Sequence, residues 1–410
     1  MSDAGAGVVI VGAGHAGGSA AAMLRQAGYD GPLTILGDEP ILPYQRPPLS
    51  KAWLKGEADA ESLALRPDSF YTENHIKVRL GERVQSISRS AQLVTLASGE
   101  TVPYDALIIA TGARARLLTI PGSDLDGVQP LRSAADAEQL KKALGPGKRL
   151  AVVGGGYIGL EAAASARALG AEAVVIEAQP RILGRSSHES LALFYTDYHR
   201  GKGVEIILDA SIEAFEGKDG HVTGVRLSDG IVVPCDHVVV GVGVIPNDDL
   251  ARDAGLETAN GVVVDLDART ADPAIYAIGD VSHRPLPGYG RMFRLESVAN
   301  ALEQARQAAY HIVGKPAPAP EVTWNWSDQY DLKYQLAGMP FDVDRVLVRG
   351  DPASGKFAVF HLNGDRIQAV ESVNAPAEFM GGKLLIGSRK PVDLAKLADT
   401  TVSMKEVAAS

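Results

Sequence analysis

The strongest constraint on the fold is a glycine-rich unit that occurs twice in the chain. Residues 8–28, "VVIVGAGHAGGSAAAMLRQAG", align without a gap with residues 150–170, "LAVVGGGYIGLEAAASARALG". Each copy begins with a short apolar run, which predicts a buried parallel strand, and continues after the glycines into an Ala-rich segment, which predicts a helix. A second apolar run closes each unit, at residues 33–36 and 173–176. The chain is therefore predicted to be an α/β protein with two Rossmann-like units.

The three glycines of each turn have separate expected roles. The first permits the tight turn, the second lets the main chain approach a pyrophosphate, and the third lets the helix pack close to the strand. These positions are Gly12, Gly14 and Gly17 in the first unit and Gly154, Gly156 and Gly159 in the second. A phosphate at such a helix N-terminus gains about 0.3–1 kcal/mol from the free N–H groups and the dipole. Two copies in the same context predict two dinucleotide sites, one for a tightly bound flavin dinucleotide and one for a nicotinamide dinucleotide that exchanges.

An acidic residue about 20 positions beyond the glycines is expected to hold the adenosine ribose. In the second unit Glu177 directly ends the strand and fits this role. In the first unit Gly37 occupies that place, so Asp38 or Glu39 must do the work, with Asp38 slightly favoured. Each could instead be a solvated turn acid. Glu177 also predicts a preference for NADH over NADPH, although Arg181 and Arg185 follow it.

Composition excludes several other classes of protein. The 410 residues are enough for two or three domains, and 46% hydrophobic with 22% charged residues is typical of a globular chain. The net charge of -10 gives no bulk attraction to nucleic acid or anionic lipid. A single cysteine, Cys235, excludes a disulfide within the chain and a redox-active cysteine pair. No metal is expected, because the nine histidines, of which His15 lies in the first glycine turn, show no ligand spacing. We expect a cytoplasmic protein, since no membrane-length apolar run or secretory signal is present.

Five further segments carry a family resemblance that extends in order over nearly the whole chain. Together they resemble the FAD-dependent, NADH-linked ferredoxin reductases of bacterial oxygenase systems, a group that includes putidaredoxin reductase and the reductase components of aromatic dioxygenases. The segments are "LPYQRPPLSK" (residues 42–51), "YDALIIATGARAR" (104–116), "IYAIGDV" (275–281), "RLESVANALEQA" (294–305) and "WSDQYDLK" (326–333).

The resemblance implies a reaction in which NADH reduces bound FAD and the flavin passes single electrons to a separate 2Fe-2S ferredoxin that supplies an oxygenase. Two alternatives stay open. One is reduction of rubredoxin or a quinone, and the other is a redox-sensing protein like apoptosis-inducing factor.

The same resemblance implies two nucleotide-binding domains of the kind found in glutathione reductase, followed by a C-terminal α+β domain. We expect an FAD domain in two segments, residues 1–118 and 243–320, an NADH domain at 119–242 and a C-terminal domain at 321–410. The Pro-rich "GKPAPAPEV" (314–322) is typical of a crossing between domains. Beyond it, "RVLVRG" and "KFAVFHLNGDRIQAVESV", with a turn at Asn363-Gly364, predict antiparallel hairpins.

Within this family the Lys of PPLSK lies by the flavin N5 and pairs with the Glu of the second glycine unit. These residues map to Lys51 and Glu161. A cation there favours the anion that forms on flavin reduction, while the carboxylate limits that effect and fixes the lysine. On periodicity alone, Lys51 would be a solvated loop lysine and Glu161 a helix acid favoured by the dipole.

Other residues are assigned to FAD by resemblance, each with an ordinary structural alternative. Asp280 is expected on the ribityl chain, or as a turn or cap residue. Arg46 and Arg132 are expected on FAD, or as surface ion-pair residues. Thr111 and Gly112 are expected where the chain passes close to the cofactor.

The resemblance also implies that Glu296 and Trp326 flank the flavin edge. A lone Trp is more often core, and we expect Trp324, two positions earlier, to face the other side of the strand. Because the chain and such ferredoxins are both acidic, docking needs a local basic patch. Arg306 and Lys333 are the candidates, with scattered solvated charge as the alternative.

Overall fold

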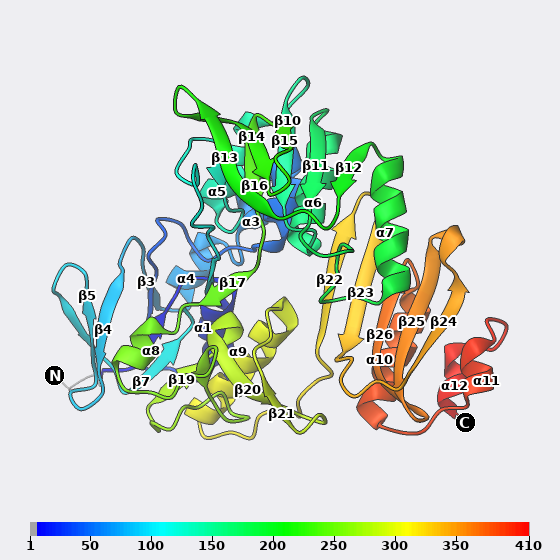
Figure 1. Cartoon of the computed structure of the whole chain (residues 1–410). Coiled ribbons are helices and arrows are strands. Elements are labelled where there is room, and N and C mark those ends of the chain that lie inside the picture. Colours follow the sequence, from blue (N-terminus) through cyan, green and yellow to red (C-terminus); the bar gives the residue numbers. More distant parts are fainter. Residues whose placement is uncertain (1–5, 410) are drawn as a thin grey trace. The chain divides into compact units, whose positions relative to one another are not determined.

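The computed structural model describes residues 6–409, which form two compact units (Figure 1). Unit 1 comprises the described residues up to Arg46, together with Ala60–Arg114 and Val244–Glu321. Unit 2 comprises Pro47–Asp59, Ala115–Gly243 and the described residues from Val322 onward. The expected division into three domains stays a prediction. No helix in residues 6–409 is both long and apolar enough to cross a membrane.

Unit 1 is built on a five-stranded parallel sheet in the order β19-β7-β1-β2-β3. Its strands are β1 (Val8–Val11), β2 (Leu33–Leu36), β3 (Ile76–Arg79), β7 (Ala106–Ile109) and β19 (Ile275–Ala277). Alternate residues of β1 point to opposite faces, as the strand period of two requires. Val8 and Ile10 pack against the alanines of α1 (His15–Ala27) and α9 (Val298–Ile312).

The other face of this sheet is covered by an antiparallel layer. Val9 and Val11 pack against a three-stranded sheet of β4 (Val84–Ser88), β5 (Leu93–Leu96) and β6 (Thr101–Pro103). The remaining elements that lie wholly in unit 1 are short: α3 (Ala60–Leu63), α4 (Asp68–Glu73), β17 (Val244–Pro246), α8 (Asp249–Asp253), β18 (Val262–Val263), η2 (Gly279–Val281), β20 (Ser282–Leu286) and β21 (Arg291–Phe293).

Unit 2 repeats this arrangement in its first part. Its parallel sheet has the order β12-β11-β10-β16-β9, with β9 (Val128–Gln129), β10 (Arg149–Val153), β11 (Glu172–Ile176), β12 (Val204–Ile207) and β16 (His237–Val240). Leu150 and Val152 of β10 pack against α6 (Tyr157–Ala168). Ala151 and Val153 pack against the antiparallel sheet of β13 (Ile212–Lys218), β14 (His221–Leu227) and β15 (Val232–Pro234). The prediction of two Rossmann-like units is confirmed.

The last part of unit 2 is a five-stranded antiparallel sheet in the order β22-β23-β26-β25-β24. Its strands are β22 (Trp324–Gln329), β23 (Leu332–Gly338), β24 (Arg345–Asp351), β25 (Lys356–Asn363) and β26 (Arg366–Val373). The helices α10 (Pro376–Ser388), α11 (Leu394–Ala398) and α12 (Met404–Ala409) follow. The predicted hairpins are confirmed, and Gly364 takes the positive φ of 61° that its turn requires.

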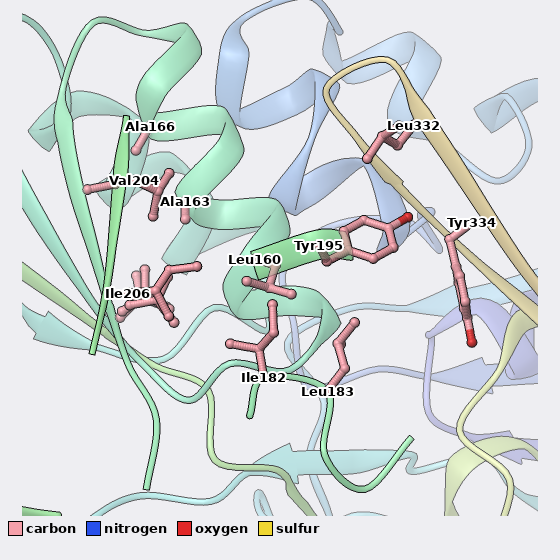
Figure 2. Packing of buried hydrophobic residues seen from close by; sticks show 14 of the residues in the cluster. Leu160, Ala163, Ala166, Ile182, Leu183, Tyr195, Val204, Ile206, Leu332 and Tyr334 are labelled. Carbon is pink, nitrogen blue, oxygen red and sulfur yellow. The ribbon is translucent and has the colours of Figure 1, made fainter. Parts of the chain in front are cut away.

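One hydrophobic core joins the two parts of unit 2. It contains Leu160 of α6, Tyr195 of α7 (Glu189–Gly201), and Leu332 and Tyr334 of β23 (Figure 2). The same cluster includes Leu54 of α2 (Ala52–Lys55), which follows η1 (Pro47–Ser50), and Leu140 of α5 (Ala134–Ala143). The nucleotide-binding sheet and the C-terminal sheet therefore share buried apolar side chains.

Candidate active site

The first glycine turn has the geometry expected of a phosphate-binding turn. Gly12 has φ of +115°, and a Cβ there would lie 2.2 Å from the carbonyl oxygen of Ala110. A Cβ at Gly17 would lie 2.0 Å from the carbonyl oxygen of Gly12. A Cβ at Gly14, by contrast, would meet no protein atom within 4 Å, although Gly14 caps the N-terminus of α1. The fold needs the two outer glycines, and the open side of the turn at Gly14 fits a dinucleotide phosphate.

The second glycine turn repeats this pattern. Gly154 has φ of +105°, and a Cβ there would lie 2.5 Å from the carbonyl oxygen of Gly241. A Cβ at Gly159 would lie 2.2 Å from the carbonyl oxygen of Gly154, whereas one at Gly156 would meet nothing within 4 Å. Gly156 caps the N-terminus of α6. This turn therefore also fits a dinucleotide phosphate.

The acidic residues of the two units lie in different settings. Glu177 accepts hydrogen bonds from the backbone N–H of Gly155 (2.7 Å) and of Gln179 (2.9 Å), so its carboxylate lies against the second glycine turn. Glu39 is engaged by the Tyr44 hydroxyl (2.8 Å) and by Arg46 Nη2 (2.7 Å). The neighbouring Asp38 is exposed.

Thr111 and Gly112 lie directly beside the first glycine turn. Asn247 fixes this crossing, because its side-chain amide donates to the carbonyl of Thr111 (2.9 Å) and its backbone N–H donates to that of Gly112 (2.9 Å). The Thr111 hydroxyl returns a hydrogen bond to the Asn247 carbonyl (2.8 Å). This role of Asn247 was not predicted from the sequence, because Thr111 lies 136 positions away.

Asp280 also lies close to this turn. A Cβ at the preceding Gly279 would be 2.9 Å from the Cβ of Ala16 in α1. Burial lowers the pKa of His15, and the negative charge of Asp280 partly opposes that effect. The buried Nδ1 of His15 has no hydrogen-bond partner among the described protein atoms. Glu296 is exposed and forms an ion pair with Arg294 (2.7 Å).

In unit 2 the structure brings Lys51 and Glu161 together. Lys51 Nζ lies 2.7 Å from Glu161 Oε2, and the Glu161 side chain is only 2% exposed. Two hydroxyls also donate to this carboxylate, Ser50 Oγ to Oε2 (2.5 Å) and Ser327 Oγ to Oε1 (2.6 Å). A buried carboxylate with three donors, one of them charged, is well compensated for the loss of water.

The hydrogen bonds to Glu161 continue deeper into unit 2. Gln329 Nε2 donates to Ser327 Oγ (3.0 Å), and Gln329 Oε1 lies 2.8 Å from Nε2 of the fully buried His199. Burial lowers the pKa of His199, and the Gln329 bond opposes that shift. When His199 is neutral and carries its proton on Nε2, each hydrogen bond in this series is donated toward the Glu161 carboxylate. Hydrogen bonds aligned in this way strengthen one another. Sequence reasoning missed Ser50, Ser327, Gln329 and His199.

The remaining predicted flavin contacts in unit 2 are Trp326 and Arg132. Trp326 is partly buried in β22, with its ring centroid 5.5 Å from that of Trp324. The expectation that Trp324 faces the other side of the strand is wrong, because residues two apart in a strand share a face. Arg132 is partly buried, and its backbone N–H donates to Asp136 at the start of α5 (3.0 Å).

The candidate docking residues lie in different units. Arg306 of α9 is 35% exposed in its side chain and lies 3.8 Å from Glu321, whereas Lys333 of β23 is exposed. Arg181, near Glu177, donates to the carbonyl of Gly184 (3.2 Å), and Arg185 is exposed. The single cysteine, Cys235, is buried, which raises the pKa of its thiol to about 12.

Comparisons with known proteins agree with this geometry. The model of the family described as pyridine nucleotide-disulphide oxidoreductase matches residues 6–305, and the reductase C-terminal model matches residues 324–408. A probable ferredoxin reductase of Castellaniella defragrans is 52% identical over 98% of both chains. A rubredoxin-NAD(+) reductase of Pseudomonas putida is 41% identical over 90% of this chain and 96% of its own.

A solved structure gives the same result. The crystal structure of the covalent putidaredoxin reductase-putidaredoxin complex matches with a TM-score of 0.96 and 40% identity, and the match covers 98% of both chains. The resemblance identified in the sequence is confirmed. The chain therefore belongs to the pyridine nucleotide-disulphide oxidoreductase family and is an oxidoreductase that uses FAD and NAD(H).

Proposed function

We propose that this protein takes a hydride from NADH onto bound FAD and passes the electrons one at a time to a 2Fe-2S ferredoxin that supplies an oxygenase. The observation that carries the proposal is the pair of open glycine turns, at Gly14 and Gly156, in one chain. One turn serves a resident cofactor and the other an exchanging substrate. FAD, when bound, supplies the ability to accept two electrons together and release them singly.

The chain's own residues bind the nucleotides and fix charge. The α1 N-terminus at Gly14 would hold the FAD pyrophosphate, with Asp38 or Glu39 on the adenosine ribose. Asp38 is the better candidate, because both oxygens of Glu39 are already engaged by Tyr44 and Arg46. The α6 N-terminus at Gly156 would hold the NADH pyrophosphate, with Glu177 on its ribose.

Lys51 is proposed to act on bound FAD as a positive charge of fixed position. Glu161 fixes that charge, because it holds Lys51 Nζ at 2.7 Å and is itself held by two serine hydroxyls. The proposal predicts that Lys51→Met makes the flavin midpoint potential more negative, since a nearby cation stabilises the reduced anion. An unchanged potential in a variant with full FAD content would remove Lys51 from the flavin environment.

Ferredoxin is the proposed electron acceptor because the matching reductases named above include a probable ferredoxin reductase and one crystallised with putidaredoxin. Rubredoxin is the second candidate, since a rubredoxin-NAD(+) reductase matches over 90% of this chain. The proposed compartment is the cytoplasm. A steady-state comparison of the two acceptors at equal NADH tests the choice, with ferricyanide as an acceptor that needs no docking. We expect much faster reduction of a 2Fe-2S ferredoxin, and faster reduction of rubredoxin would contradict the proposal.

The docking residues are tested in the same assay. Arg306→Glu and Lys333→Glu should each slow ferredoxin reduction and flatten its salt dependence, because an acidic partner loses an attractive charge. Ferricyanide reduction should stay unchanged. If both reversals leave ferredoxin kinetics as they were, these two residues do not form the docking site.

A further inference from the structure

A second buried acid, Glu371 of β26, has no part in the function described so far. Its side chain is 2% exposed, and it accepts three hydrogen bonds. Tyr334 donates its hydroxyl to Oε2 (3.0 Å), while His361 Nε2 (2.7 Å) and the backbone N–H of His188 (3.0 Å) lie on Oε1. Burying a carboxylate so deeply costs free energy unless hydrogen bonds replace its contacts with water. Because moving any of these three donors away would leave the charge uncompensated, they are held around it.

Glu371 reaches the second glycine turn through two tyrosines. The Tyr157 hydroxyl donates to the Tyr334 hydroxyl (2.7 Å), which in turn donates to Glu371, and the two rings are 5.1 Å apart. Tyr157 is the first residue of α6 and directly follows Gly156. Burial raises the pKa of Tyr157 to about 12, so its phenol stays protonated and able to donate.

The same acid also anchors the loop that covers the turn. Its bond from the backbone of His188 fixes one end of the segment 183–188. Ser187 in this segment hydrogen-bonds Tyr157 (2.8 Å), and the backbone N–H of Leu183 donates to the carbonyl of Gly155 (2.9 Å). Figure 2 shows Leu183 packed in the same cluster as Leu160 and Tyr334. Tyr157, next to Gly156, and the 183–188 loop, which is bonded to Gly155, are thus both tied to one carboxylate in the C-terminal sheet.

We propose that Glu371 is a positioning residue for the nicotinamide nucleotide, acting on Tyr157 through Tyr334 and on the 183–188 loop through the backbone of His188. Glu371 itself need not touch the nucleotide. Glu371 holds Tyr157 and the 183–188 loop in place before NADH binds. The binding of NADH then does not have to supply the free energy needed to order them. This inference rests on the proposed function of the second turn as the NADH site.

Two substitutions test this inference in the FAD-loaded enzyme with ferricyanide as acceptor. Glu371→Gln places an NH₂ group among three donors, and Tyr334→Phe removes only the hydroxyl that links Glu371 to Tyr157. We expect each to raise the KM for NADH, and the Kd for NAD⁺ measured by calorimetry, roughly tenfold, with kcat and FAD content within twofold of the unmodified enzyme. Glu378→Gln is the matched control, since Glu378 pairs with Arg349 (3.4 Å) in the same part of the chain.

The alternatives are distinguishable. A KM within twofold of the unmodified enzyme for the Tyr334→Phe variant overturns the proposal, and so does a change in Glu378→Gln as large as in Glu371→Gln. Loss of FAD together with kcat in both variants would assign Glu371 a merely structural role. An unmodified enzyme that binds FAD but neither oxidises NADH nor binds NAD⁺ would instead refute the proposed function itself.

Discussion

The two glycine turns share one backbone geometry but differ in the position available to the acidic residue that is proposed to bind the adenosine ribose. In the second turn Gly155 leaves room for Glu177, whose Oε2 lies 2.7 Å from the Gly155 nitrogen. In the first turn the equivalent residues are Ala13 and Gly37, and a Cβ on Gly37 would lie only 2.5 Å from the Cβ of Ala13. The Ala13 methyl group takes the space that a strand-end acid would need. This crowding fits the glycine at position 37, and it is consistent with the proposal that an acid of the following loop, Asp38 or Glu39, serves the first turn.

The first and largest predicted change in stability concerns a feature that both turns share, the backbone conformation at Gly12 and Gly154. Gly12→Ala and Gly154→Ala should each lower the free energy of unfolding by about 2–5 kcal/mol, because both residues have positive φ and both Cβ atoms would clash with a backbone oxygen. Urea unfolding of FAD-free protein measures this. Gly14→Ala and Gly156→Ala are the controls, since their Cβ atoms meet nothing within 4 Å. Equal stability of all four variants would show that the turn geometry is wrong.

The second prediction concerns a feature in which the turns differ, the strand-end acid Glu177. Glu177 can accept hydrogen bonds from both ribose hydroxyls of NADH and would repel the 2′-phosphate of NADPH. We expect kcat/KM to favour NADH by a factor of about ten to a thousand, equivalent to about 1.4–4 kcal/mol, and Glu177→Ala to lose most of that preference. Steady-state kinetics with both nucleotides measure it. Equal use of NADPH by the unmodified protein would contradict this prediction. Glu177 would then only hydrogen-bond its own turn and would not select between the two nucleotides.

The smallest effect concerns acid sensitivity of the Glu161 network. Burial keeps the pKa of His199 below its ordinary value, so the unfolded chain takes up a proton at a pH where the folded protein does not. Stability should therefore fall as the pH drops through about 6.5, by at most ~1.4 kcal/mol per pH unit for this one group. Between pH 7.5 and 5.5 the His199→Gln variant should lose less stability in urea unfolding than the unmodified protein. The exposed His221 serves as control through His221→Gln. Parallel pH profiles for the unmodified protein and the His199 variant would contradict this account.

The parts predicted from the sequence are the parts encoded locally. The spacing of the glycines, the apolar runs beside them and the Asn363-Gly364 turn all act within a few residues, so periodicity and turn chemistry reveal them. The contact between Lys51 and Glu161 spans 110 positions and was expected only from the family resemblance. Nothing local marks Ser327 as a donor to Glu161, or Asn247 as the residue that fixes Thr111, because those pairs are 166 and 136 positions apart.

The mistaken and missed residues of the C-terminal sheet have different causes. Trp324 was expected on the wrong face because a period of two was misapplied, a local error that the sequence itself could have prevented. The only local signal for Glu371 is its place in the alternation, because residues two apart share a face and its neighbours there, Ile367, Ala369 and Val373, are apolar. Its hydrogen-bond partners Tyr334 and His188 are 37 and 183 positions away, so the alternation could not identify them.

The two turns are proposed to hold different nucleotides, a resident FAD at Gly14 and an exchanging NADH at Gly156. The most direct test compares Gly14→Ala with Gly156→Ala in the FAD-to-protein ratio after desalting and in the KM for NADH. Because each added methyl group would fill only the space of the phosphate, Gly14→Ala should lose most of its FAD. Gly156→Ala should keep a full complement of FAD and raise the KM for NADH by about tenfold or more. The opposite pattern, with FAD lost from Gly156→Ala and retained by Gly14→Ala, would contradict the assignment of the two sites.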